Sequence, residues 1–125
     1  MTTPHLILAD YPNNRPRRLR RDDFSRRLVR EHSLSVNDLI YPVFVTEGKK
    51  VKQAIDSMPG VVRYSLDTLL PVAEECVKLG VPIMALFPVI DPALKTPEGG
   101  EAINIDGLIP RVVTALKKRF PELGI

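Results

Sequence analysis

The sequence is that of a mildly basic chain of single-domain size. It has 125 residues, a formal net charge of +3 and 44% hydrophobic residues. No apolar run approaches the roughly 20 residues that a transmembrane helix needs. The single cysteine, Cys76, excludes an internal disulfide and a multi-thiolate metal site within these residues. We therefore expect a cytoplasmic protein with no membrane partner.

The positive charge is concentrated near the N-terminus. Eight arginines lie between Arg15 and Arg30, where only Asp22 and Asp23 oppose them. Because guanidinium groups pair with carboxylates through two parallel hydrogen bonds, this segment suits an acidic protein surface. A nucleic-acid-binding arm and a solvated tail without a partner are the alternatives. The aromatic residues and recognition helix typical of nucleic-acid binding are missing, so we expect no nucleic-acid partner.

The first thirty residues predict an arm that ends in a short helix. Residues 1 to about 20 contain three prolines and no helical or strand periodicity, which is typical of an extended segment. Asp22 or Asp23 is a suitable N-cap for a helix that carries Phe24 and runs to about Arg30. Residues 1–30 are therefore expected to lie outside the core.

Two apolar, β-rich segments predict parallel strands. Leu39–Val45 contains Pro42, typical of a buried or edge strand, and ends in the polar sequence Thr46–Gly48, which suits a cavity or solvent. Ile83–Val89 is apolar throughout, as expected for a parallel strand covered on both faces. The turn Met58–Val61 and a solvated loop, Gly48–Lys52, lie between the two segments.

Each predicted strand leads to a helix. Leu66–Leu79 has apolar residues at helical spacing, Ser65 as a plausible N-cap and Gly80 as a C-terminal stop. The last helix is expected to begin at Asn104 or Asp106. The long loop before it lies at the carboxyl end of the second strand, where parallel sheets place ligand-handling residues.

The order of elements predicts an α/β fold that continues further than two strands. Residues 31–125 form the first two βα units, and a third strand is expected to begin within Pro121–Ile125. Two parallel strands do not make a stable sheet by themselves. The chain is therefore expected to be the first part of a larger βα protein, with heavy oligomerisation as the alternative.

Catalytic motifs are scarce. There is no P-loop, dinucleotide fingerprint or nucleophile elbow. Lys49, Lys50 and Lys52 have no apolar enclosure that would lower their pKa, so they are expected to be surface lysines. Cys76 is expected to be a packed thiol rather than a nucleophile.

Five short motifs resemble those of the porphobilinogen synthase (5-aminolevulinate dehydratase) family in order and spacing. They are Arg15–Arg21, Leu34–Val45, Met58–Val61, Ala85–Val89, and Asn104–Leu108 with the closing Phe120–Glu122. The similarity extends from about Arg15 to Ile125. It implies the first part of a (β/α)8 TIM barrel, preceded by an extended N-terminal arm and incomplete in this chain.

The resemblance also implies an activity. Members of the family are lyases that condense two molecules of 5-aminolevulinate into porphobilinogen for tetrapyrrole and haem synthesis, commonly as homo-octamers. Their two Schiff-base lysines and their divalent metal, magnesium or zinc, belong to parts of the enzyme beyond this sequence. No catalytic residue or metal ligand is therefore assigned, and this fragment alone is expected to be inactive.

Two groups of site residues follow from the resemblance. Phe87 is expected to line the substrate cavity, with plain barrel core as an equal alternative. Arg17, Arg18, Arg20 and Phe24 are expected to contact a neighbouring subunit through the arm. The alternative function is a non-catalytic module that binds a protein partner through the same arm.

Overall fold

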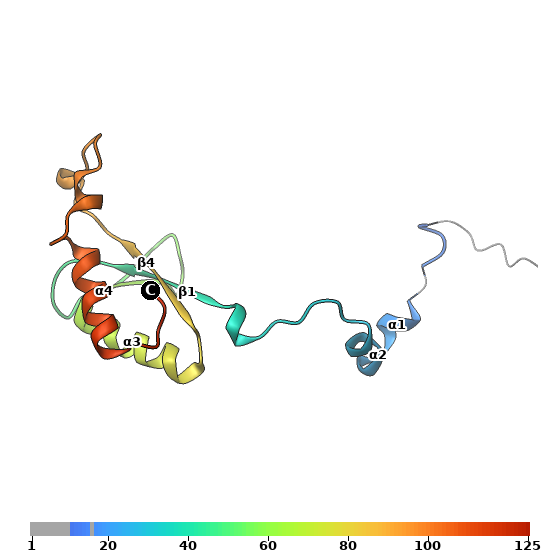
Figure 1. Cartoon of the computed structure of the whole chain (residues 1–125). Coiled ribbons are helices and arrows are strands. Elements are labelled where there is room, and N and C mark those ends of the chain that lie inside the picture. Colours follow the sequence, from blue (N-terminus) through green and yellow to red (C-terminus); the bar gives the residue numbers. More distant parts are fainter. Residues whose placement is uncertain (1–10, 16) are drawn as a thin grey trace, which may run out of the picture. The chain divides into compact units, whose positions relative to one another are not determined.

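The computed structural model describes residues 11–15 and 17–125 (Figure 1). They fall into two units that part between Leu34 and Ser35, and each unit is described by itself. The expectation of an extended arm over residues 1–10 and Pro16 lies outside the described residues. Within the described parts of the chain, no helix combines the length and apolar character that crossing a bilayer requires.

The N-terminal unit contains two short helices, α1 (Arg18–Arg21) and α2 (Asp23–Leu28). Asp22 is the N-cap residue of α2, as predicted, and the helix ends before Arg30. Helix α1 was not predicted. It is a single turn whose carbonyls bind a side chain from further along the chain, and such a contact leaves no pattern in the local sequence. The Arg26 guanidinium donates to the carbonyls of Arg20 and Arg21 at 3.1 and 3.0 Å, where a helix leaves carbonyls without partners.

The C-terminal unit is built around a four-stranded sheet in the order β2-β3-β1-β4. Its elements are the 3-10 helix η1 (Val36–Asp38), β1 (Ile40–Val45), β2 (Lys52–Ala54), β3 (Val62–Tyr64), α3 (Leu66–Leu79), β4 (Ile83–Pro88), η2 (Pro92–Leu94), η3 (Gly100–Ile103) and α4 (Leu108–Arg119). β1 is parallel to β3 and β4, whereas β2 and β3 are antiparallel. The two predicted parallel strands are thus confirmed and lie side by side.

The hairpin of β2 and β3 was missed by the sequence reasoning. Each strand has only three residues, and β2 is polar and exposed. Neither is long enough to show the alternation of apolar and polar residues by which a strand is recognised in a sequence. The turn that joins them was recognised: the amide of Val61 donates to the carbonyl of Met58 at 2.9 Å, and Gly60 adopts a positive φ of 84°.

Pro42 lies where β1 is paired with β4 but has no neighbour on the side of β3. β3 pairs with β1 only at Phe44 and Val45. The amide of Thr46 donates to the carbonyl of Tyr64 on β3. Because the direction of backbone groups alternates along a strand, the nitrogen of Pro42, four residues earlier, points to the same side as that of Thr46. At that position β3 no longer runs beside β1. The missing N–H therefore costs no ladder hydrogen bond.

Helices α3 and α4 pack against one face of the sheet, and the core lies between (Figure 1). Val43, Val45 and Met84 point into this core from β1 and β4, and both helices contribute fully buried leucines. Helix α3 begins after Ser65 and ends at Gly80, whose φ of 76° is the left-handed conformation that glycine tolerates best. Helix α4 begins a few residues later than Asn104 or Asp106, with Gly107 at its N-cap.

Within the C-terminal unit, no residues cover the opposite face of the sheet, which corrects one expectation. Ile83 and Phe87 on β4 are 41% and 50% exposed, so this unit covers β4 on one face only. Here we call this face, which carries Ile40, Phe44, Ile83 and Phe87, the open face.

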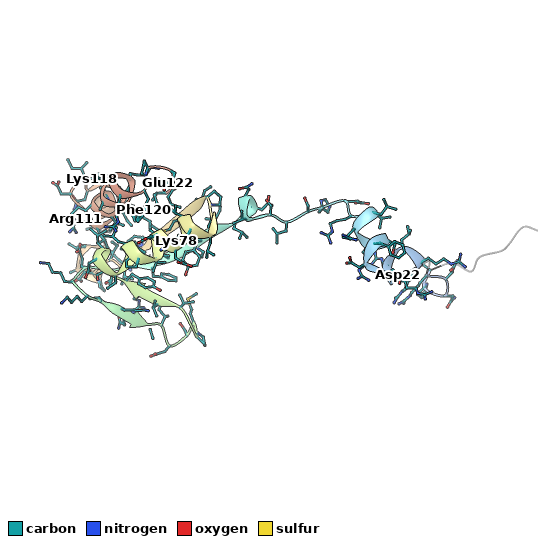
Figure 2. The ribbon with its side chains drawn as sticks, turned by 90° about the horizontal axis from the view of Figure 1, so that it is seen from below. Asp22, Lys78, Arg111, Lys118, Phe120 and Glu122 are labelled. Carbon is teal, nitrogen blue, oxygen red and sulfur yellow. The ribbon has the colours of Figure 1, made fainter. Side chains whose placement is uncertain are left out.

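An isolated parallel bridge lies where a third strand was expected to begin. Gly124 bridges Ile83, with hydrogen bonds from the Met84 amide to its carbonyl (2.9 Å) and from its own amide to the Pro82 carbonyl (2.8 Å). The turn after α4, near the labelled Phe120 and Glu122 in Figure 2, is held by Lys117. Its ammonium donates to the carbonyls of Pro121 and Leu123 at 3.1 and 2.7 Å.

Candidate functional site

The carboxyl ends of β1 and β4 meet at one edge of the sheet. Val45 is paired with Pro88, so the loops that follow the two strands leave from the same place. Two hollows lie here, of about 400 and 320 Å³. The first is lined by residues of the loop after β4, including Lys95, Thr96 and Glu101, and by the start of α4. The second lies between the loop after β1 and the starts of α3 and α4.

Phe87 lies on the open face near this edge. Phe44 is paired with Phe87 on one side and with Arg63 on the other, and Arg63 is paired in turn with Gln53. These four side chains form a row across the sheet, in which the Phe44 and Phe87 rings are 5.8 Å apart at an angle of 44°. The Arg63 guanidinium is 3.4 Å from the Gln53 amide oxygen.

The loop after β1 is held at its far end by a hydrogen-bond network from α3. The buried Ser65 hydroxyl accepts from the Val51 amide at 2.9 Å and donates to the Asp67 carboxylate at 2.6 Å. Asp67 also accepts from the Lys50 amide at 2.8 Å, and the Thr68 hydroxyl donates to the Val51 carbonyl at 2.6 Å. Ser65 is thus at the predicted N-cap position, but its hydroxyl positions this loop rather than the amides of the helix.

Hydrogen bonds also favour the ionised form of Asp67. The Ser65 hydroxyl and the Lys50 amide hold the pKa of the Asp67 carboxyl below its usual value. A lowered native-state pKa contributes stability that is present above the unfolded-state pKa, about 3.9, and is lost as the pH falls through the native-state value.

We expect the stability advantage of the wild type over Asp67→Asn to be full above about pH 5 and to shrink below about pH 4. The measurement is the free energy of unfolding in urea across this range, with Asp56→Asn in the exposed segment before Met58 as the control. An advantage that stays constant down to pH 2, or that grows as the pH falls, would contradict the role given to Asp67.

An ion pair joins the loop after β1 to α4. The guanidinium of Arg111, labelled in Figure 2, contacts the carboxylate of Glu47 and also donates to the carbonyls of Asp106 and Gly107 at 3.1 and 3.2 Å. Glu47 thus contacts a neighbouring helix. Since both side chains are more than half exposed, the pair adds little stability, and it links the loop after β1 to the start of α4.

Other candidate groups are accounted for by the fold. Burial and the nearby Glu75 carboxylate raise the pKa of the Cys76 thiol, as expected for an inert packed cysteine. Lys49, Lys50 and Lys52 are exposed, as predicted. Among residues 11–15 and 17–125, no three His, Cys, Asp or Glu side chains come close enough together to hold a metal ion.

Arg17, Arg18 and Arg20 lie in the N-terminal unit. They line a hollow of about 1100 Å³ together with Tyr11, Asn14, Arg15 and Arg21. Arg26 and Arg27 are paired with Asp23, whereas no ion pair among the described residues involves Arg17, Arg18 or Arg20. Phe24 is 69% exposed and does not line this hollow.

Comparison with known proteins points to one enzyme family. The sequence profile of the family described as delta-aminolevulinic acid dehydratase matches residues 13–125. The dehydratase of Bradyrhizobium diazoefficiens is 47% identical over 111 residues, which cover 89% of this chain and 31% of that protein. The dehydratase of Synechocystis is 41% identical over 115 residues, which cover 92% and 35% respectively.

A solved structure has a similar fold over most of this chain. It is the delta-aminolevulinic acid dehydratase (porphobilinogen synthase) of Toxoplasma gondii in complex with the reaction product porphobilinogen, and it matches with a TM-score of 0.79 at 40% identity. The match covers 88% of this chain and 31% of that protein. The chain spans about a third of the length of these relatives. With the profile match over residues 13–125, this assigns the chain to the delta-aminolevulinic acid dehydratase family.

Proposed function

We propose that this chain supplies the N-terminal third of an enzyme that condenses two molecules of 5-aminolevulinate into porphobilinogen. The observation that carries the proposal is the match of nearly the whole chain to one family of enzymes, in sequence and in fold. The parallel order of β1 and β4, followed by the pairing of Gly124 with Ile83, is also what the start of a TIM barrel requires. No observation favours the alternative of a non-catalytic binding module.

The architecture proposed is a barrel domain from residue 31 onward, preceded by an arm over residues 1–30. In a TIM barrel the helices lie outside and the other face of the sheet faces the interior. The open face then becomes interior surface, and Phe87 lies at the carboxyl end, where barrel enzymes bind substrates. Its exposure in this chain is consistent with a cavity-lining role.

The catalytic groups are proposed to belong to the part of the longer relatives that follows the matched segment. This part would supply the two Schiff-base lysines and hold the divalent metal, magnesium or zinc. A lysine that attacks a ketone needs a depressed pKa from burial or neighbouring cations. The exposed lysines of this chain, Lys49, Lys50, Lys52, Lys78, Lys95, Lys117 and Lys118, offer no such setting.

The arm is proposed to contact a neighbouring copy of the enzyme, commonly an octamer in this family. Arg17, Arg18 and Arg20 are exposed around one hollow and have no carboxylate partner among the described residues, so they are available to an acidic surface. Exposed Phe24 adds an apolar contact. No nucleic-acid partner is proposed, and the cytoplasmic location stays a prediction from the sequence.

Fusing this chain to the remaining two thirds of the 47% identical relative tests the proposal. The fusion is expected to form porphobilinogen from 5-aminolevulinate, whereas the 125-residue chain alone is expected to form none. A folded but inactive fusion would contradict the proposed function.

In the same fusion, replacing Arg17, Arg18 and Arg20 with serine is expected to give a smaller oligomer by light scattering. An unchanged oligomer size would contradict the proposed contacts of the arm with a neighbouring copy.

Phe87→Ala in the fusion separates the two roles considered for Phe87. If Phe87 lines the cavity, kcat/KM is expected to fall roughly tenfold, equivalent to about 1.4 kcal/mol, with little change in melting temperature. If it is plain barrel core, the melting temperature falls and kcat/KM of the folded enzyme stays the same. Ile103→Ala, at an exposed loop position near the same edge, is the control for both readouts.

A further inference from the structure

The hollow in the N-terminal unit is lined by side chains of one sign of charge. The lining residues are Tyr11, Asn14, Arg15, Arg17, Arg18, Arg20 and Arg21. The carboxylate of Asp22 contacts Arg21 at 3.8 Å and that of Asp23 is paired with Arg26 and Arg27, but neither aspartate belongs to the lining. Among the described residues, five guanidinium groups and no carboxylate therefore line this hollow.

Contacts within the unit favour an anion in this place. The Arg15 guanidinium lies 5.2 Å from the centre of the Tyr11 ring, a cation–π distance that fixes one side of the hollow. The carbonyls at the end of a helix carry partial negative charge, which repels anions. At the end of α1, the Arg26 guanidinium donates to the carbonyls of Arg20 and Arg21 and so covers this charge.

The number of arginines indicates the chemistry of the ligand. Guanidinium groups bind phosphate oxygens through two parallel hydrogen bonds. One phosphate group carries only about 1.5 to 2 negative charges at neutral pH, so several are needed to balance five arginines. The arginines surround one hollow of about 1100 Å³, whereas sites for nucleic-acid strands follow the backbone along a groove.

We propose that this hollow binds an oligophosphate, a compact chain of linked phosphate groups that is either inorganic or part of a nucleotide. The N-terminal unit contains every residue of the site, so binding does not depend on the proposed enzymatic activity. The oligophosphate and an acidic surface of a neighbouring copy would compete for Arg17, Arg18 and Arg20.

The first experiment titrates the 125-residue chain with inorganic tripolyphosphate, orthophosphate or ATP by isothermal calorimetry at physiological ionic strength. Tripolyphosphate is expected to bind at least tenfold more tightly than orthophosphate, because it engages several arginines at once. Orthophosphate that binds as tightly, or tripolyphosphate that does not bind, would overturn the proposal. ATP that binds as tightly as tripolyphosphate would show that the phosphate chain is sufficient, and tighter binding of ATP would identify a nucleotide as the ligand.

Two double variants separate the hollow from the general charge of the segment. Arg18→Ser with Arg20→Ser removes two lining residues, and Arg27→Ser with Arg30→Ser removes two exposed arginines outside the lining. The first variant is expected to bind tripolyphosphate at least tenfold more weakly, since it loses hydrogen bonds to a charged ligand. The second is expected to change the affinity no more than about twofold, because salt screens distant charges. An equal loss in both variants would overturn the site.

A measurement on the wild type decides the question if a substitution disturbs the unit. In nuclear magnetic resonance spectra, the side-chain Nε–H signals of Arg15, Arg18 and Arg20 are expected to shift and to saturate as tripolyphosphate is added. Arg119 is the internal control, since it ends the basic run Lys117–Arg119 of α4. Equal shifts at Arg119, or no shift at the three lining arginines, would overturn the proposal.

The fusion enzyme keeps this result apart from the proposed function. An active fusion together with a chain that does not bind tripolyphosphate would refute the oligophosphate site alone. An inactive fusion together with binding that depends on Arg18 and Arg20 would refute the activity and support the site.

Discussion

Replacing Leu69 with alanine is expected to lower the free energy of unfolding by about 2–5 kcal/mol. Leu69 is fully buried where α3 packs on the sheet, within the cluster that also contains Val45 and Leu116. Truncation removes apolar surface from the core and leaves a cavity that the rigid sheet and helices fill only in part. The measurement is urea unfolding of the 125-residue chain followed by circular dichroism.

Leu79→Ala is the matched control, since it makes the same change near the end of the same helix. Leu79 is 64% exposed, and alanine is at least as good a helix former as leucine. The control is therefore expected to change the free energy of unfolding by no more than about 0.5 kcal/mol. If both variants unfold at the same urea concentration as the wild type, the packing of α3 on the sheet is wrong.

Ser65→Ala is expected to destabilise the chain by about 1–3 kcal/mol, although it removes a single oxygen atom. The hydroxyl is fully buried, accepts from the Val51 amide and donates to Asp67. Alanine leaves the Val51 N–H without its partner and removes a donor to the Asp67 carboxylate. The cost is that of an unsatisfied buried group rather than that of one average hydrogen bond.

The control for Ser65→Ala is Ser57→Ala, in the exposed turn between β2 and β3, where no change beyond about 0.5 kcal/mol is expected. Ser65→Ala is also expected to speed hydrogen exchange at the Val51 and Lys50 amides, because the network holds this loop. A destabilisation of the same size in both serine variants would mean that the network contributes nothing specific.

The long regular elements were the parts that could be predicted from the sequence. Leu66–Leu79 shows a helical period between Ser65 and Gly80, and Ile83–Pro88 is an uninterrupted apolar run, so local pattern and tertiary packing agree there. The beginning of a third strand was also expected, and Gly124 pairs with Ile83. The helix and the apolar strand depend on residues close together in the sequence, whereas the third strand was expected from the repeating order of strands and helices.

The parts that could not be predicted depend on contacts between distant residues. β2 and β3 are short, and β3 becomes a strand through its pairing with Phe44 and Val45. The loop Gly48–Lys52 was expected to be solvated, and its lysine side chains are exposed, but Ser65 and Asp67 hold its backbone from 14 and 17 residues away. The contact of Glu47 with Arg111 spans 64 residues and has no local signal.

Pro42 has a consequence for the direction in which the sheet grows. Besides the outer side of β4, two strand edges are open in this unit: the stretch of β1 that β3 does not reach, and the outer side of β2. On the open stretch of β1, Pro42 has no backbone N–H to donate to another strand. The outer strand β2 has only three residues, all exposed, and it begins with Lys52, a charged residue of the kind that discourages pairing at a sheet edge. Additional strands are therefore accepted on the β4 side alone. The sheet of this unit therefore offers an incorrect strand few places to pair while the chain folds.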